Sequence, residues 1–268
     1  MLHEGLALVA LGPGARIIME GKKAGERPAF AVGVTKEARM SKVELKPGAI
    51  LSPVPVVMAS CGTPENPNII TIAWTGTVCS DPPMTYISVR PQRYSYDIIR
   101  EAGEFTINFV NQDLLFAADW CGVKSGRDVD KFREQNLTAV PGKLVTCPSI
   151  AESPVNLECR VKDIIPLGSH DMFLAEIVCM TVDESLMDPS GALRLDRAGL
   201  VAYNHGHYYP LQKLELGRFG YSVMKPKTRK RYEAEKRARS RAASRARQQG
   251  KGKGRGKDLA KGRDRNGK

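Results

Sequence analysis

The sequence contains no hydrophobic run as long as a membrane-spanning helix, which argues against a helical membrane protein. Its apolar N-terminal stretch, residues 6–11, is too short for the core of a signal peptide and follows no Lys or Arg. The six cysteines form no Cys-x-x-Cys pair and no zinc-type spacing, and several lie within apolar strand patterns. We therefore expect buried, reduced thiols in a cytoplasmic protein.

Signatures of nucleotide binding and of hydrolysis are missing as well. Gly12 and Gly14 lack the third glycine and the preceding strand of a dinucleotide fingerprint, and no Walker sequence occurs. No serine–histidine–aspartate order or cysteine–histidine pair stands out. His205 and His207 could share a metal ion, but no acidic ligands lie nearby, and we predict no metal site. Any chemistry is then expected to come from a cofactor.

Positive charge is concentrated at one end of the chain. Residues 225–268 hold 19 of the 41 Lys and Arg residues and 4 of the 29 Asp and Glu residues, a net charge of +15. The rest of the chain has a net charge of −3. The overall basicity therefore indicates no general nucleic-acid-binding face on the globular part.

Composition divides the chain into three parts. Residues 1–40 are rich in glycine and show no sustained period, which predicts a disordered extension or a true start at Met40. Residues 41–224 carry the patterns of one folded domain, and a basic, low-complexity, disordered tail follows. Within the tail, residues 228–249 are compatible with a solvated helix and residues 250–256 with a flexible segment.

Short β-branched runs separated by turns dominate the folded part. Residues 68–79 and 84–90 are predicted to form two strands joined by a tight turn at Ser80–Pro83. Residues 154–165 and 172–182 are predicted to form a hairpin. The pattern favours a mainly β barrel or sandwich with a few short helices over βαβ repeats.

A basic strand end and a helix start follow one another closely. Arg90 ends the second strand, Arg93 comes next, and Ser95 stands where an N-cap is expected, before a helix that Gly103 closes. Cations beside a helix N-terminus suit a phosphate group, although most capped helix starts bind nothing. A phosphate site is one interpretation of this segment.

Two further short helices are expected. Asp113 is a suitable N-cap and Gly122 a suitable stop for the first. Asp128 can cap the second, which places Lys131 in its first turn. Because a cation there opposes the helix dipole, Lys131 either faces a bound anion or pairs with a nearby carboxylate.

Taken in order, these segments resemble the flavin reductase-like family, and more closely its flavoredoxin branch. The resemblance extends over residues 43–222, and its most specific elements are the following: Asn68–Trp74, Ser80–Pro83, Val89–Tyr96, Phe105–Asn108, Cys121–Phe132, Gly168–His170, Tyr203–Tyr209 and Gly217–Gly220. It implies an FMN-binding split β-barrel of Greek-key topology. The basic tail has no counterpart in the family pattern.

The resemblance also implies a set of FMN-binding residues. Those whose side chains match the family's FMN contacts are Asn68, Trp74, Ser95, Lys131, His170 and Tyr203. Arg90 is expected to add charge at the phosphate, and the strand containing Thr75, Gly76, Thr77 and Cys79 to meet the polar edge of the flavin ring. His170 is expected to tune the flavin rather than act as an obligatory acid or base. For Trp74, a place in the core is the competing interpretation.

Two classes of function follow from this resemblance. In the first, favoured one, the protein is an oxidoreductase whose FMN accepts hydride from NAD(P)H and passes electrons on. In the second, it is a flavoredoxin-type electron-transfer protein reduced by a protein donor. A homodimer is implied in both cases. Residues 225–268 either bind nucleic acid weakly and without sequence preference or form a solvated appendage.

Overall fold

The computed structural model describes residues 42–211 and 215–238. The chain divides into two units, Met1–Leu51 and Ser52–Lys268, and all strands and helices of the described residues belong to the second. The predicted extension over residues 1–40, the alternative start at Met40 and the tail from residue 239 onward lie outside the described residues.

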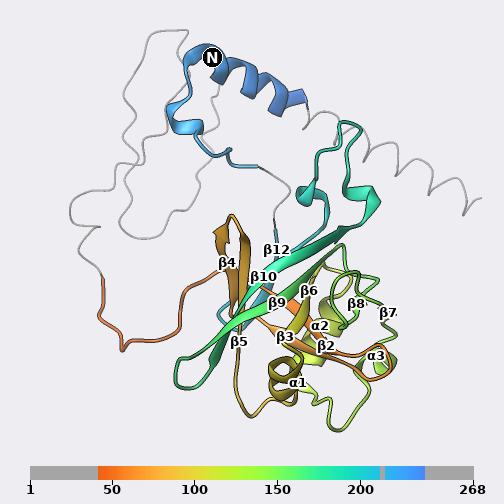
Figure 1. Cartoon of the computed structure of the whole chain (residues 1–268). Helices are drawn as coiled ribbons and strands as arrows, with labels where there is room; N and C mark the ends of the chain where they lie inside the picture. The colour runs from red at the N-terminus through yellow and green to blue at the C-terminus, as the bar shows by residue number, and fades with distance from the viewer. Residues whose placement is uncertain (1–41, 212–214, 239–268) are drawn as a thin grey trace, which may run out of the picture. The chain divides into compact units, whose positions relative to one another are not determined.

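A seven-stranded antiparallel sheet forms the body of the second unit (Figure 1). Its strands, in spatial order, are β3 (Pro67–Ile72), β2 (Val57–Gly62), β6 (Glu104–Phe109), β9 (Val155–Pro166), β10 (Asp171–Val182), β5 (Pro83–Val89) and β4 (Thr75–Ser80). The two edge strands, β3 and β4, are consecutive in the chain but are not paired with each other. The sheet is therefore a barrel that stays open between them, and the predicted mainly β split barrel is confirmed.

Smaller elements surround this sheet. A second sheet contains β1 (Val54–Pro55), β11 (Val201–Asn204) and β12 (His207–Pro210), and a third contains β7 (Ala139–Val140) and β8 (Ser149–Ile150). The labelled helices are α1 (Tyr94–Ala102), α2 (Leu115–Val123), α3 (Lys131–Glu134) and three 3₁₀ turns at Glu184–Leu186, Leu195–Arg197 and Tyr221–Val223. Among the described residues, no helix has the length and hydrophobicity needed to cross a membrane.

Strand β2 explains how the sheet buries both of its faces. Val57, Ala59 and Cys61 point into one core with α1, whereas Met58 points into a second core with α2 and α3. Side chains alternate between the two faces of a strand, so a strand covered on both sides becomes a continuous apolar run. All six cysteines are free, as expected, and four of them are buried.

The predicted turn at Ser80–Pro83 is confirmed, since it joins the paired strands β4 and β5, but the strand predicted before it is broken at Trp74. The sequence predicts one strand over residues 68–79, but β3 ends at Ile72 and β4 starts at Thr75. Strand β4 then pairs with β5, and the Trp74 carbonyl accepts a backbone hydrogen bond of 2.9 Å from Ser88 N–H. Because of this break, one β-branched run forms both edge strands of the sheet, β3 and β4.

The starts of α2 and α3 differ from the prediction by a few residues. Asn111 rather than Asp113 accepts a backbone hydrogen bond at the start of α2, from Leu114 N–H at 3.0 Å. Asp130 rather than Asp128 caps α3. Asp, Asn and Ser have similar capping ability, so packing of the buried helix face decides among neighbouring candidates.

The start of the basic tail is ordered rather than disordered. Residues 226–238 are helical, with Pro226 at the first helical position. Tyr232 is only 9% exposed, its hydroxyl donates to a Glu215 carboxylate oxygen, and Arg218 lies 4.9 Å from the centre of its ring. The predicted helix is confirmed over residues 228–238, and full solvation is wrong only at Tyr232, which has polar and cationic partners upstream. Nucleic-acid binding by the tail stays a prediction.

Candidate functional site

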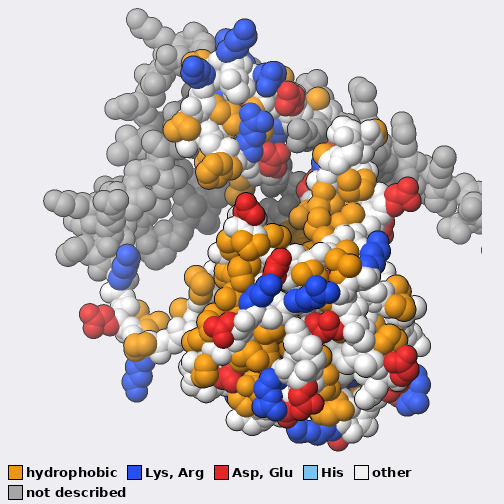
Figure 2. Space-filling view, viewed as in Figure 1, with side chains coloured by type: hydrophobic (Ala, Val, Ile, Leu, Met, Phe, Trp, Pro, Cys, Tyr) orange, Lys and Arg blue, Asp and Glu red, His pale blue; other side chains and the backbone are white. Residues whose placement is uncertain are grey.

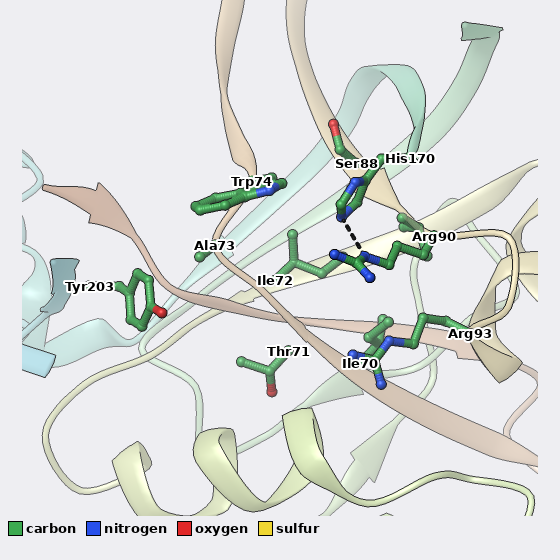
Figure 3. Close-up of a pocket in the computed structure, with 11 residues that line it drawn as sticks. Ile70, Thr71, Ile72, Ala73, Trp74, Ser88, Arg90, Arg93, His170 and Tyr203 are labelled. Atoms are coloured by element: carbon green, nitrogen blue, oxygen red, sulfur yellow. Dashed lines mark hydrogen bonds between the residues drawn. The ribbon is translucent and has the colours of Figure 1, made fainter. Parts of the chain in front are cut away.

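A cavity of about 380 Å³ lies where β3 gives way to β4 (Figure 3). Its walls come from β3, the end of β5, the start of α1, the β9–β10 turn and β11. The lining residues are Ile70, Thr71, Ile72, Ala73, Trp74, Ser88, Val89, Arg90, Arg93, His170 and Tyr203. Its volume falls within the range typical of small-molecule sites.

The cavity is chemically two-sided. Figure 3 shows the rings of Trp74 and Tyr203 toward one side and the guanidinium groups of Arg90 and Arg93 toward the other, with His170 close to Arg90. Trp74 is 37% exposed, so it is not a core residue in this structure. The arrangement suits a ligand that is flat and aromatic at one end and anionic at the other.

The two arginines lack a carboxylate partner among the described residues. The only side-chain hydrogen bond of Arg90 within that part of the chain runs from its Nε to His170 Nε2, at 3.4 Å. Arg93 is the N-cap of α1, and no side chain caps the helix there. Two cations without a carboxylate partner therefore lie on the same side of the cavity, beside the start of α1.

Hydrogen bonding assigns the protonation of His170. Because a guanidinium can only donate, His170 Nε2 accepts from Arg90 and carries no proton. The proton then lies on Nδ1, which donates to Ser169 Oγ at 2.9 Å. Partial burial, followed by the charges of Arg90 and Arg93, lowers the pKa of His170. The imidazole is thus held neutral beside the arginines.

Replacing Arg93 with alanine is expected to raise the pKa of His170, because one of the two nearby positive charges is removed. An NMR titration of the ring protons measures this, with Arg133→Ala, at an exposed side chain of α3, as the control. Since folding lowers this pKa, neutral His170 stabilises the folded state above the pKa of the unfolded chain. That contribution is lost as pH falls through the folded pKa. A pKa that Arg93→Ala leaves unchanged would contradict the prediction.

Three of the predicted contact residues form a buried layer outside the cavity lining. Asn68, Ser95 and Lys131 are 5%, 2% and 4% exposed. Asn68 Nδ2 donates to Ser95 Oγ at 2.8 Å. Lys131 Nζ donates to the carbonyls of Ile69 and Cys121, both at 2.7 Å, and burial lowers its pKa. Lys131 therefore pairs with backbone carbonyls in this structure, not with a carboxylate.

Ser95 does not cap α1. It is the second residue of the helix, and its hydroxyl faces Asn68 of β3 instead of the first-turn backbone. The predicted helix end is confirmed, since Gly103 adopts a left-handed conformation with φ of 67° and closes α1 through a hydrogen bond to Ile99 O. Ser95 thus links the start of α1 to β3, the strand that contributes Ile70, Thr71 and Ile72 to the cavity wall.

The strand predicted to meet a flavin ring edge lies next to the cavity but does not line it. Thr75, Gly76, Thr77 and Cys79 all belong to β4, which follows Trp74 directly. Strand β4 pairs only with β5 among the described residues, so its other edge has unpaired backbone groups. Contact of these four residues with a ligand stays a prediction.

Sequence patterns gave no reason to select several of the wall residues. Thr71 is the most informative of them: its Oγ1 donates to Ala118 O of α2 at 2.5 Å. A Cβ at Gly122 would lie 3.2 Å from Thr71 Cβ, so a small residue is needed where α2 passes β3. An alternating strand pattern identifies two faces, but it does not show which one borders a cavity.

An antiparallel barrel left open between consecutive strands, with its cavity at that opening, is the architecture of the split-barrel flavoproteins. The family model described as "Flavin reductase like domain" matches residues 48–212. The chain belongs to this family, and the resemblance stated from the sequence is confirmed. This is a family of flavin-dependent oxidoreductases.

Similar proteins include solved flavoredoxins and a monooxygenase reductase. Flavoredoxin of Desulfovibrio vulgaris (Miyazaki F) is 31% identical, with a TM-score of 0.62 over 67% of this chain and 98% of that one. Flavoredoxin from Methanosarcina acetivorans is 25% identical, with a TM-score of 0.62 over 68% and 99%. The reductase component of 4-nitrophenol 4-monooxygenase/4-nitrocatechol 2-monooxygenase from Rhodococcus opacus is 32% identical over 108 residues, which cover 40% of this chain and 55% of that protein.

Proposed function

We propose that the protein is an FMN-dependent oxidoreductase that takes hydride from NAD(P)H and passes electrons on through bound FMN. The observation that carries this proposal is the two-sided cavity. The unneutralised Arg90 and Arg93 offer a phosphate site, and Trp74 and Tyr203 offer aromatic contacts on the other side.

The residues present fit FMN better than FAD. A cavity of about 380 Å³ lies near the lower end of the range for small-molecule sites, which favours a mononucleotide. Arg90, Arg93 and the start of α1 would bind its phosphate. Trp74 and Tyr203 would flank its ring, and the free edge of β4 would donate to the polar ring atoms.

FMN supplies hydride acceptance and electron transfer when bound, so the protein contributes binding, orientation and electrostatics. Neutral His170 orients Arg90 through the 3.4 Å hydrogen bond and has no proton on Nε2 to give away. We therefore assign it a tuning and orienting role rather than that of a general acid. With a flavin bound, Trp74 and Tyr203 would shield the apolar part of its ring from water.

A flavoredoxin-type electron carrier is the second candidate, favoured by the 31% identity to a flavoredoxin over nearly all of that protein. Stopped-flow mixing of the FMN-loaded protein separates the two. We expect NADH or NADPH to bleach the flavin absorbance rapidly. Bleaching by reduced ferredoxin alone, with neither nicotinamide active, would establish the carrier. A protein that binds no FMN would overturn both.

We also propose that the protein acts as a homodimer in the cytoplasm. Exposed apolar side chains support a dimer: Val78 on β4 is 51% exposed and Met180 on β10 is 56% exposed. Figure 2 shows hydrophobic surface over β4 and the end of β10. The six free thiols agree with a reducing compartment. Sedimentation analysis checks the dimer, and a monomer at all concentrations would contradict it.

A further inference from the structure

Tyr203 reaches the cavity from a strand that lies outside the barrel sheet. Strand β11 pairs only with β1 and β12 among the described strands. Tyr208 of β12 stands directly opposite Tyr203 in this pairing. The two ring centres are 5.6 Å apart, with an angle of 60° between the rings. The position of the Tyr203 ring therefore depends on Tyr208 as well as on the core of the barrel, against which both tyrosines pack.

Tyr208 is held in turn by helix α2. Its hydroxyl donates to Asp119 Oδ1 at 2.8 Å. Burial and this hydrogen bond raise the pKa of Tyr208 to about 12, so the phenol remains a donor at neutral pH. Without that bond, the ring would be fixed by packing alone.

The same turn of α2 also holds a second part of the cavity wall, at Thr71. Ala118, the residue before Asp119, accepts the 2.5 Å hydrogen bond from Thr71 Oγ1. Thr71 and Tyr203 both line the cavity but come from different sheets. A continuous path of contacts thus connects the two walls through α2, from Thr71 to Ala118 and Asp119, then to Tyr208 and Tyr203.

We propose that Asp119 and Tyr208 are positioning residues that fix the distance between the Tyr203 and Thr71 walls. They would thereby determine how closely the cavity fits a flat aromatic ring. The inference rests on the proposed function, in which the ring is the isoalloxazine of FMN. Neither residue lines the cavity itself, so both act through the walls that they hold.

Asp119 and Tyr208 are expected to affect binding of the ligand's ring but not binding of its phosphate. Arg90, Arg93 and His170 have no hydrogen bond or ring contact with Asp119 or Tyr208. Loss of the Asp119–Tyr208 hydrogen bond should therefore weaken binding of the ring and leave binding of the phosphate unchanged. A general loss of structure would weaken both.

Tyr208→Phe tests this, because it removes the hydroxyl and keeps the ring. We expect the Kd values for FMN and for riboflavin, measured by quenching of flavin fluorescence, to rise by the same factor of about ten. The Kd for ribitol phosphate, measured by calorimetry, should not change. Tyr209→Phe is the matched control: its side chain is 50% exposed and its hydroxyl has no hydrogen bond among the described residues.

Substitutions of Asp119 provide a second, independent variant. Asp119→Ala should reproduce the effect of Tyr208→Phe, and Asp119→Asn, which keeps an acceptor oxygen, should restore most of the affinity. Flavin binding that Tyr208→Phe does not alter, or an equal loss of ribitol phosphate binding, would overturn the inference alone. An unmodified protein that binds neither flavin would overturn the proposed function and this inference with it.

Discussion

Replacing Arg90 and Arg93 together with alanine is expected to weaken FMN binding by about 2–5 kcal/mol. Both arginines line the cavity, and neither has a carboxylate partner among the described residues, so both are available to a phosphate. Because both side chains are exposed at its rim, the loss should be largest at low ionic strength. Fluorescence titration of FMN at two salt concentrations measures it.

Arg100 and Arg133 provide the matched control pair. Both are exposed, and each lies beside an acidic side chain, Asp97 at 2.8 Å and Glu134 at 3.3 Å. Their joint replacement with alanine removes the same charge from outside the cavity lining and should leave the Kd for FMN nearly unchanged. Equal losses in the two double variants would mean that the effect reflects net charge, and the proposed phosphate site would be wrong.

Glu158→Ala is expected to lower the free energy of unfolding by about 3–4 kcal/mol. The Glu158 side chain, on β9, belongs to a residue only 2% exposed. Its carboxylate accepts backbone hydrogen bonds from Lys143 at 2.8 Å, Leu144 at 2.7 Å and Val145 at 3.2 Å. Alanine leaves three amide groups without their acceptor, one of them at a buried position and two at partly buried ones. Urea unfolding of both proteins measures the difference.

Glu152→Ala is the control for this prediction. Glu152 also accepts from the backbone, with both oxygens 3.1 Å from Thr138 N, but the interaction is exposed. Water can replace the lost acceptor there, so the expected loss is about 1 kcal/mol or less. Similar losses for the two variants would show that burial does not set the strength of the Glu158 contacts.

Features encoded over a few neighbouring residues were predictable from the sequence. The long hairpin of β9 and β10 follows from two β-branched runs with a turn between them. Gly103 closes α1 because a left-handed conformation suits glycine. The split barrel as a whole was predicted from resemblance rather than from these patterns, since strand order depends on pairings between distant segments.

Errors arose where several neighbouring residues had similar local preferences. Ser95, Asp113 and Asp128 are all capable caps, yet each lies one or two residues from the N-cap position of its helix. The run over residues 68–79 contains no proline or turn sequence to mark its break at Trp74. In each case the burial of a helix face or strand face outweighs a local preference of about 1 kcal/mol.

For the site, the sequence by itself determined which kinds of side chain are present: two arginines at a helix start, a tryptophan after a β-branched run, and a histidine in a hairpin turn. Only the tertiary structure decided which of them face the cavity. Arg90, His170 and Tyr203 come from three separate segments and line it together, whereas Lys131 turns inward to the carbonyls of Ile69 and Cys121. The reason is physical, because local preferences act over a few residues, while the direction of a side chain relative to a cavity is set by strand pairing and core burial across the whole domain.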